Sequence, residues 1–325
     1  MVRETRNVKR VKEMPRYALR VTPYALRDQT STTRSSAWVP YLFIAPALAL
    51  FAIFSVYSFS LLSYLSLFEW DGVSPVKQFV GLGNYWSVIV HDAVFWRSFW
   101  QAGTITAMAL AFQNSLALGL ALTVNQRIRF GTFYRMLFFL PPILSEIVVG
   151  LIWAWIYDGN YGIFNELLKA IGLGHMTRSW LADPKTAITA VAVIHMWKGF
   201  GWGFVIFLAG LQTIPQELYE AATVDGANAW SRFRHITLPL LMPVCVVVSV
   251  LTILGTMQIF ALIMATTQGG PAFHTEVPIT RIMASMLGSS RLGYACAQGI
   301  VFGLILLTVS LLQMRLSRRM NRATV

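Results

Sequence analysis

The chain has 325 residues, of which 56% are hydrophobic and 12% are charged. Soluble domains average about 25% charged residues, and disordered chains combine low hydrophobicity with high charge, so the composition excludes both classes. The net charge of +12 fits either nucleic acid or a membrane surface as a partner, and the placement of the basic residues decides between them.

Six apolar segments are long enough to cross a bilayer, which takes about 20 residues. Two of the segments contain ionisable residues: Glu146 interrupts one, and His195 and Lys198 interrupt another. The sequence therefore predicts an all-α integral membrane protein with six transmembrane helices, over residues 38–66, 100–124, 133–157, 187–211, 238–266 and 294–315.

The basic residues indicate the orientation of these helices. The tail 1–36 carries nine Lys and Arg residues, and placing it in the cytoplasm puts 18 of the 26 on that side, including Arg127, Arg129 and Arg135. Both termini are then cytoplasmic, and the basic tail contacts anionic lipid. No interleaving of basic and aromatic residues is present, so we expect no nucleic-acid partner. The predicted domains are the tail 1–36, a membrane domain 37–316 and a second tail 317–325.

The loops on the outer side are longer, at about 67–99, 158–186 and 267–293. We expect short helices on the outer face there, in particular over 162–172. The two cysteines, Cys245 and Cys296, form no CxxC or Cys/His cluster, so we expect neither a metal site nor a disulfide framework.

The cytoplasmic loop 213–239 carries helix signals that a plain connector lacks. Thr213 and Gln216 have the spacing of a capping box, and Pro215 fits a first turn. The pattern predicts a helix of about 12 residues, some 18 Å long, that ends at Gly226. A second short helix is expected after Asn228, before Pro239 opens the next span.

The first half of this predicted helix is acidic, with Glu217 and Glu220 near its N-terminus. An amphipathic helix resting on lipid is one interpretation. However, anionic lipid on the cytoplasmic side repels an acidic helix, which favours a protein partner.

Glu220-Ala221-Ala222, followed by Gly226, Ile236 and Leu238-Pro239, resembles the EAA loop of the permease subunits of ABC importers. The similarity extends over about residues 38–316. Other segments are similar to the carbohydrate-uptake branch of this family, which includes the maltose and glycerol-phosphate systems: Phe79–Tyr85, Leu137–Pro141, Trp197–Gly199, Gln212–Tyr219 and Gly269–Pro271.

The resemblance implies that this loop docks on a separate ATPase subunit in the bacterial or archaeal inner membrane. It also implies four kinds of partner: two ATPase subunits, a second permease, an extracytoplasmic solute-binding protein and a sugar. No GxxxxGK[ST] motif is present, so we expect no cofactor and no enzymatic activity here, with ATP and Mg bound by the partner subunits. The expected coupling residues are Glu217, Glu220, Ala221, Ala222, Asp225, Gly226, Ile236, Leu238 and Pro239.

Charged residues inside a membrane are costly and mark candidate functional sites. Glu146 and Lys198 fit two hypotheses: a structural ion pair between helices, or the lining of a translocation cavity. The resemblance favours the cavity, because sugar contacts of the maltose-type permease match Glu146, His195, Lys198, Gly199, Thr252, Thr256 and Ile259, with Gln258 beside them. The maltose-type permease has neutral polar groups at the first three positions. Trp153, Trp197, Phe200 and Trp202 supply rings nearby.

The function implied is import of a sugar or sugar derivative by alternating access. One alternative is another polar solute, such as a glycerol phosphate. A second is a self-sufficient secondary transporter with Glu146 as proton carrier, which predicts inverted repeats that the sequence does not show. A membrane phosphotransferase is disfavoured, because Asp225-Gly226 is followed by Trp230 where its metal motif requires arginine.

Overall fold

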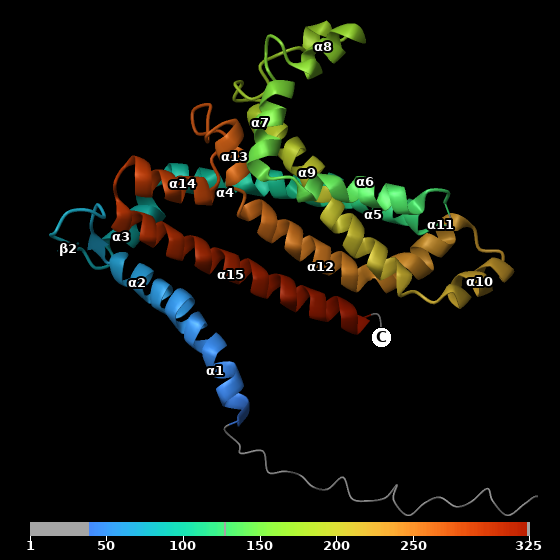
Figure 1. The fold of residues 1–325 in the computed structure, drawn as a ribbon, viewed down its shortest axis with the longest axis horizontal. Helices are drawn as coiled ribbons and strands as arrows, with labels where there is room; N and C mark the ends of the chain where they lie inside the picture. The colour runs from blue at the N-terminus through green and yellow to red at the C-terminus, as the bar shows by residue number, and fades with distance from the viewer. Residues whose placement is uncertain (1–38, 127, 324–325) are drawn as a thin grey trace, which may run out of the picture. The chain divides into compact units, whose positions relative to one another are not determined.

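The computed structural model describes residues 39–126 and 128–323 (Figure 1). The tail 1–36 and Arg127, to which the sequence assigned cytoplasmic positions, lie outside the described residues, as does the end of the second tail. The chain divides after Ser58 into two units. The described part of the first unit is helical, with α1 (Val39–Phe51) followed by the π-helical segment η2 (Ala52–Tyr57) and the start of α2 (Ser58–Leu65).

The second unit is helical apart from β1 (Phe68–Glu69) and β2 (Gln78–Phe79), which pair antiparallel. Its first helices are α3 (Gly83–Trp86), η3 (Ser87–His91), α4 (Ala93–Met108), η4 (Ala109–Gln113), α5 (Asn114–Asn125), α6 (Gly131–Ile143), α7 (Glu146–Ile156) and α8 (Ile163–Ala170). Then follow η5 (Gly174–Met176), α9 (Ala187–Gln212), α10 (Gln216–Val224), α11 (Ala229–Arg232), η6 (Phe233–Thr237), α12 (Leu238–Met257), α13 (Ala261–Thr266), α14 (Pro278–Met283), η7 (Ala284–Gly288) and α15 (Leu292–Ala323).

Five helices in the described chain are long and apolar enough to cross a membrane: Tyr41–Leu65, Ala93–Asn125, Ala187–Gln212, Ala229–Met257 and Leu292–Arg315. Together α6 and α7 are long and apolar enough for one more span, but they are bent by 94° at the break between them. Each of the six predicted segments is thus largely helical.

The prediction of one continuous helix over 133–157 was wrong. Leu144 and Ser145 are extended, with ψ of 141° and 137°, and separate α6 from α7. Pro141 and Pro142 precede the break, and their missing N–H groups weaken the last turn of α6. As a result Glu146 is not in the middle of a span but is the first residue of α7.

The predicted span 238–266 was also wrong at both ends. The helix starts nine residues earlier, at Ala229, and ends at Met257, before a break that leads into α13. Pro239 does not open a new helix, because the π-helical segment η6 carries α11 into α12 without interruption. Since proline lacks an N–H group, a change from α to π hydrogen bonding just before Pro239 accommodates it.

Helix α9 is the most enclosed of these spans and packs against α4, α5, α6, α7, α12 and α13. One buried cluster, around Ile194 and Ile263, joins α4, α7, α9 and α13. A second, around Phe204 and Leu241, joins α5, α9 and α12. The apolar pattern of α9 on several sides is therefore explained by protein neighbours as well as by lipid.

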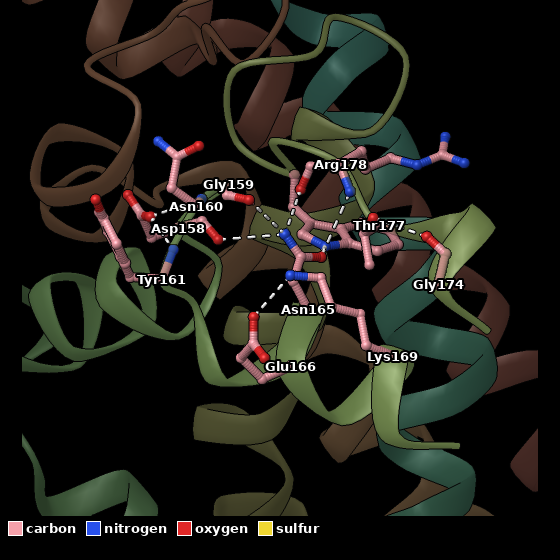
Figure 2. A network of polar contacts seen from close by, with 11 residues as sticks. Asp158, Gly159, Asn160, Tyr161, Asn165, Glu166, Lys169, Gly174, Thr177 and Arg178 are labelled. Atoms are coloured by element: carbon pink, nitrogen blue, oxygen red, sulfur yellow. Dashed lines mark hydrogen bonds and ion pairs between the residues drawn. The ribbon is translucent and has the colours of Figure 1, made fainter. Parts of the chain in front are cut away.

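The short helix predicted over 162–172 is present as α8. Figure 2 shows how Asn165 on this helix holds the surrounding loops together. Its Nδ2 donates to the carbonyl oxygens of Asp158, Gly159 and Arg178, and its Oδ1 accepts from Trp180 Nε1 at 2.8 Å. One buried side chain thus fixes the whole connection between α7 and α9.

Candidate functional site

Two charged side chains meet where α7 begins beside the middle of α9. Lys198 Nζ lies 3.9 Å from Glu146 Oε1. The break before α7 places the Glu146 carboxylate at a helix N-terminus, where the helix dipole favours negative charge. The two groups therefore attract each other without a direct hydrogen bond, and both retain free hydrogen-bonding capacity.

The pair faces a cavity of about 390 Å³ between α7, α9, α12 and the end of η4. Its wall contains both hydrogen-bonding groups and the indole of Trp202. The cavity is lined by Gln113, Glu146, His195, Lys198, Gly199, Trp202, Gly203, Ile206, Val248, Leu251, Thr252 and Gly255. Five of the eight candidate ligand residues are therefore brought together: Glu146, His195, Lys198, Gly199 and Thr252.

The other three candidates lie elsewhere. The hydroxyl of Thr256 is fully buried and hydrogen-bonded to Thr106 Oγ1 at 2.7 Å, so it joins two helices. Ile259 is buried in the cluster around Ile194. Gln258 is exposed at the end of α12 and does not line the cavity.

Of the four candidate rings, only Trp202 lines this cavity. Trp153 and Trp197 contact each other, with ring centroids 5.6 Å apart, and Trp153 lines a separate apolar pocket beside α8. Phe200 packs in the cluster around Phe204. Sequence proximity to Lys198 therefore identified one ring that lines the cavity and three that do not.

Sequence reasoning missed Gln113. Its amide borders the cavity directly opposite Gly199. The signal is present in the sequence, because Gln113 and Asn114 are adjacent amides within an otherwise apolar segment.

The acidic segment after α9 forms the helix α10, nine residues long. Its N-cap is Pro215 and not Thr213, so the predicted capping box was wrong. The Thr213 hydroxyl instead donates to the Gly210 carbonyl oxygen at the end of α9. Glu217, Glu220, Ala221 and Asp225 are exposed on α10 and its C-cap, and Ala222 is half-buried.

The end of α10 was predicted correctly. Gly226 has φ of +78°, and its N–H donates to the Thr223 carbonyl oxygen. The N–H of Ala227 donates to the Ala222 carbonyl oxygen at 2.8 Å, which completes a Schellman motif. A residue with a Cβ would adopt this left-handed conformation only with strain.

Two side-chain contacts tie α10 to the next helix. The Tyr219 hydroxyl hydrogen-bonds Thr237 Oγ1 at 2.9 Å, and Arg232 donates to Thr223 Oγ1 at 3.0 Å. Asn228 caps α11 as predicted, accepting from Ser231 N–H at 2.8 Å. The predicted separate second helix was wrong, since α11 continues into α12. Ile236, Leu238 and Pro239 are half-buried along this continuous helix.

On the other side of the molecule, the loop after α13 is held to α4. Arg97 Nη2 contacts His274 Nε2 at 2.6 Å, and Gln101 donates to the Phe273 carbonyl oxygen at 2.8 Å. Glu276 in the same loop is buried, and burial raises the pKa of its carboxyl above 4.5, with Arg281 opposing the shift and Asp92 adding to it. Phe273 is left half exposed at the tip of a braced loop.

Among the residues that the structure describes, no group of three or more His, Cys, Asp and Glu side chains is arranged to hold a metal ion. The arrangement instead offers hydrogen-bonding groups inside a cavity. Outside the cavity, α10 and the loop after α13 are each held in place by side-chain hydrogen bonds.

Residues 113–322 match the family model described as binding-protein-dependent transport system inner membrane component. The probable ABC transporter permease protein YurN of Bacillus subtilis is 36% identical, and the match covers 85% of this chain and 95% of that protein. The trehalose/maltose transport system permease protein MalF of Thermococcus litoralis is 31% identical, covering 86% and 93%. The sulfoquinovosyl glycerol transport system permease protein SmoG of Agrobacterium fabrum is 33% identical, covering 85% and 89%.

The fold is also found in a solved structure, a bacterial ABC transporter involved in the import of the acidic polysaccharide alginate. The TM-score is 0.74 at 24% sequence identity, and the match covers 87% of this chain and 96% of that chain.

Proposed function

Because this chain belongs to the family of inner membrane components of binding-protein-dependent transport systems, we propose that it carries a sugar or sugar derivative into the cell. As a member of this family it is a permease subunit of an ABC importer in the inner membrane, with several membrane-spanning helices. It is not an enzyme, and ATP hydrolysis belongs to partner subunits.

The observation that carries the sugar assignment is the mixed polar lining of the cavity around Lys198 and Glu146. Sugars present many hydroxyl groups, each of which both donates and accepts hydrogen bonds. A hydroxyl between Lys198 Nζ and Glu146 Oε1, which are 3.9 Å apart, would accept from the amine and donate to the carboxylate. Trp202 offers a ring face in the same cavity, and relatives whose names state trehalose, maltose or sulfoquinovosyl glycerol as cargo support the class.

The proposed topology has six spans, with α6 and α7 together forming the bent third one, and both termini in the cytoplasm. The excess of basic residues in the tails and in the loops before α6 and after α10 supports this orientation. The acidic helix α10 is then cytoplasmic, and the loop between α13 and α14 faces outward.

In the proposed assembly, α10 docks on an ATPase subunit and transmits its movement to α9 and α12. A helix that transmits movement needs a fixed end and contacts that hold it to the neighbouring helix. The Schellman motif at Gly226 and the Tyr219–Thr237 and Arg232–Thr223 contacts provide both. The remaining partners are a second ATPase subunit, a second permease and an extracytoplasmic binding protein, which meets outer loops such as 267–293.

The test is to express the tagged chain with its neighbouring transporter genes and to purify it in detergent. We expect an ATPase with a P-loop and a second permease to copurify, and reconstituted vesicles to accumulate labelled saccharide when ATP and binding protein are present. ATP hydrolysis by a complex containing only this polypeptide would contradict the assignment.

A further inference from the structure

Gln113 is a buried amide whose oxygen has no partner. The side chain is 6% exposed, and Oε1 is buried without a hydrogen bond. An unpaired polar atom in a low-dielectric interior is costly, and polar groups in membrane spans usually find partners. Gln101, Gln298 and Gln313 also have a buried amide oxygen without a hydrogen bond, so Gln113 is distinguished by its position at the wall of the cavity.

Two other polar residues on the same span, Thr106 and Asn114, provide a contrast, because each has a side-chain partner on α12. Thr106 pairs with Thr256, and Asn114 Oδ1 accepts from Thr252 Oγ1 at 3.0 Å. These two contacts join the span Ala93–Asn125 to α12. The amide of Gln113 instead borders the cavity shared with Lys198 and Glu146.

The backbone around Gln113 makes room for this placement. Gln113 is the last residue of the π-helical segment η4, and such segments often occur at functional sites. On the facing helix, a Cβ at residue 199 would lie 2.9 Å from both Nε2 and Oε1 of Gln113. Glycine at position 199 therefore leaves the space that the amide occupies, and alanine there would push the amide aside.

From this arrangement we infer that Gln113 is a ligand-contacting and specificity-determining residue, whose amide hydrogen-bonds hydroxyl groups of the sugar beside Lys198. The inference rests on the proposed function, because it takes the cavity to be the place where sugar binds. An amide both accepts and donates, so it discriminates by the position of a hydroxyl group and not by charge.

The first test measures thiol accessibility in the full complex. The two native thiols are removed beforehand, by Cys245→Ser and Cys296→Ala. The probe is trimethylammonioethyl methanethiosulfonate, which reacts with thiols that reach water. We expect Gln113→Cys to be labelled and its matched neighbour Asn114→Cys to remain unlabelled. A thiol at residue 113 that is as unreactive as the thiol at residue 114 would overturn the inference.

The second test is uptake of labelled maltose, trehalose and raffinose by the reconstituted complex. For the saccharide that the wild type accumulates, Gln113→Met should raise the apparent KM about tenfold, the value expected for one or two lost hydrogen bonds. Gly199→Ala should raise KM by a smaller factor. Gln313→Met removes a half-buried amide whose oxygen is also buried without a partner, outside the cavity, and should leave KM unchanged.

Monodeoxy analogues of the same saccharide identify the hydroxyl. The wild type should transport one analogue more poorly than the parent sugar. Gln113→Met should transport that analogue and the parent sugar equally well, because the variant lacks the amide that binds the missing hydroxyl. An unchanged KM in Gln113→Met contradicts the inference. If the wild type accumulates none of the saccharides but the thiols at 113 and 114 still differ in labelling, the sugar assignment is what fails.

Discussion

Lys198 Nζ lies 3.9 Å from Glu146 Oε1, and this contact joins the first residue of α7 to the middle of α9. The side chains are 14% and 39% exposed, respectively, and both line the cavity. The sequence left two hypotheses for these charges, a structural ion pair or a ligand site, and the long separation is compatible with a ligand hydroxyl between them.

The two hypotheses differ in their prediction for the double variant Glu146→Gln with Lys198→Met. Removing one partner leaves an unpaired charge, whereas removing both should largely restore assembly. If the charges bind ligand, the double variant should assemble and show ATPase stimulation by the binding protein, but lose about ten- to a hundredfold in uptake. Wild-type uptake rate and affinity would exclude direct ligand contact by either charge.

Asn165 is predicted to control the stability of the outer connection around α8. It is 1% exposed and serves three carbonyl oxygens and one indole N–H (Figure 2). Asn165→Leu would leave buried polar groups unpaired, so we expect a loss of about 2–4 kcal/mol in local stability. The measurement is limited proteolysis between residues 158 and 186. Asn160→Ala is the control, because Asn160 is exposed in the same loop, and equal cleavage of the two variants would contradict the prediction.

Local signals predicted the elements that depend on a few neighbouring residues. The left-handed Gly226, the Asn228 cap and helix α8 were all recognised from their own sequence. Features that depend on contacts between helices were not. Thr252 and Thr256 lie one helical turn apart on α12, and the sequence alone does not distinguish them. Thr252 borders the cavity, whereas the hydroxyl of Thr256 is buried against Thr106.

The breaks in the third and fifth spans were missed for a related reason. A straight helix and a bent helix of the same composition are equally apolar. Hydropathy therefore carries no information about the 94° bend before Glu146. The proline pair at 141–142 is the local signal for this break, because two missing N–H groups weaken the last turn of α6.

Glu276 gives the loop between α13 and α14 a predicted pH dependence. Burial raises the pKa of its carboxyl above 4.5, so the folded state binds the proton more tightly than the unfolded chain does. The resulting stabilisation is complete below pH 4.5 and is lost as the pH rises through the higher folded-state pKa. Thermal unfolding of the purified complex at pH 5 and pH 8 should therefore show a smaller difference in Glu276→Gln than in the wild type. Glu166→Gln alters an exposed carboxylate and should behave like the wild type, so a wild-type difference in Glu276→Gln would refute the prediction.

Gly226 is predicted to matter for coupling and not for membrane insertion. Its φ is +78° and a Cβ there would meet no atom within 4 Å, so any penalty comes from the backbone alone. Gly226→Val should cost about 1–2 kcal/mol locally and loosen the end of α10, which lowers uptake and ATPase copurification while the amount of chain in the membrane stays constant. Gly226→Asn is the matched control, because asparagine tolerates the left-handed region and should retain most activity. Normal transport by a stably inserted Gly226→Val variant would show that the geometry of this helix end does not transmit the ATPase movement.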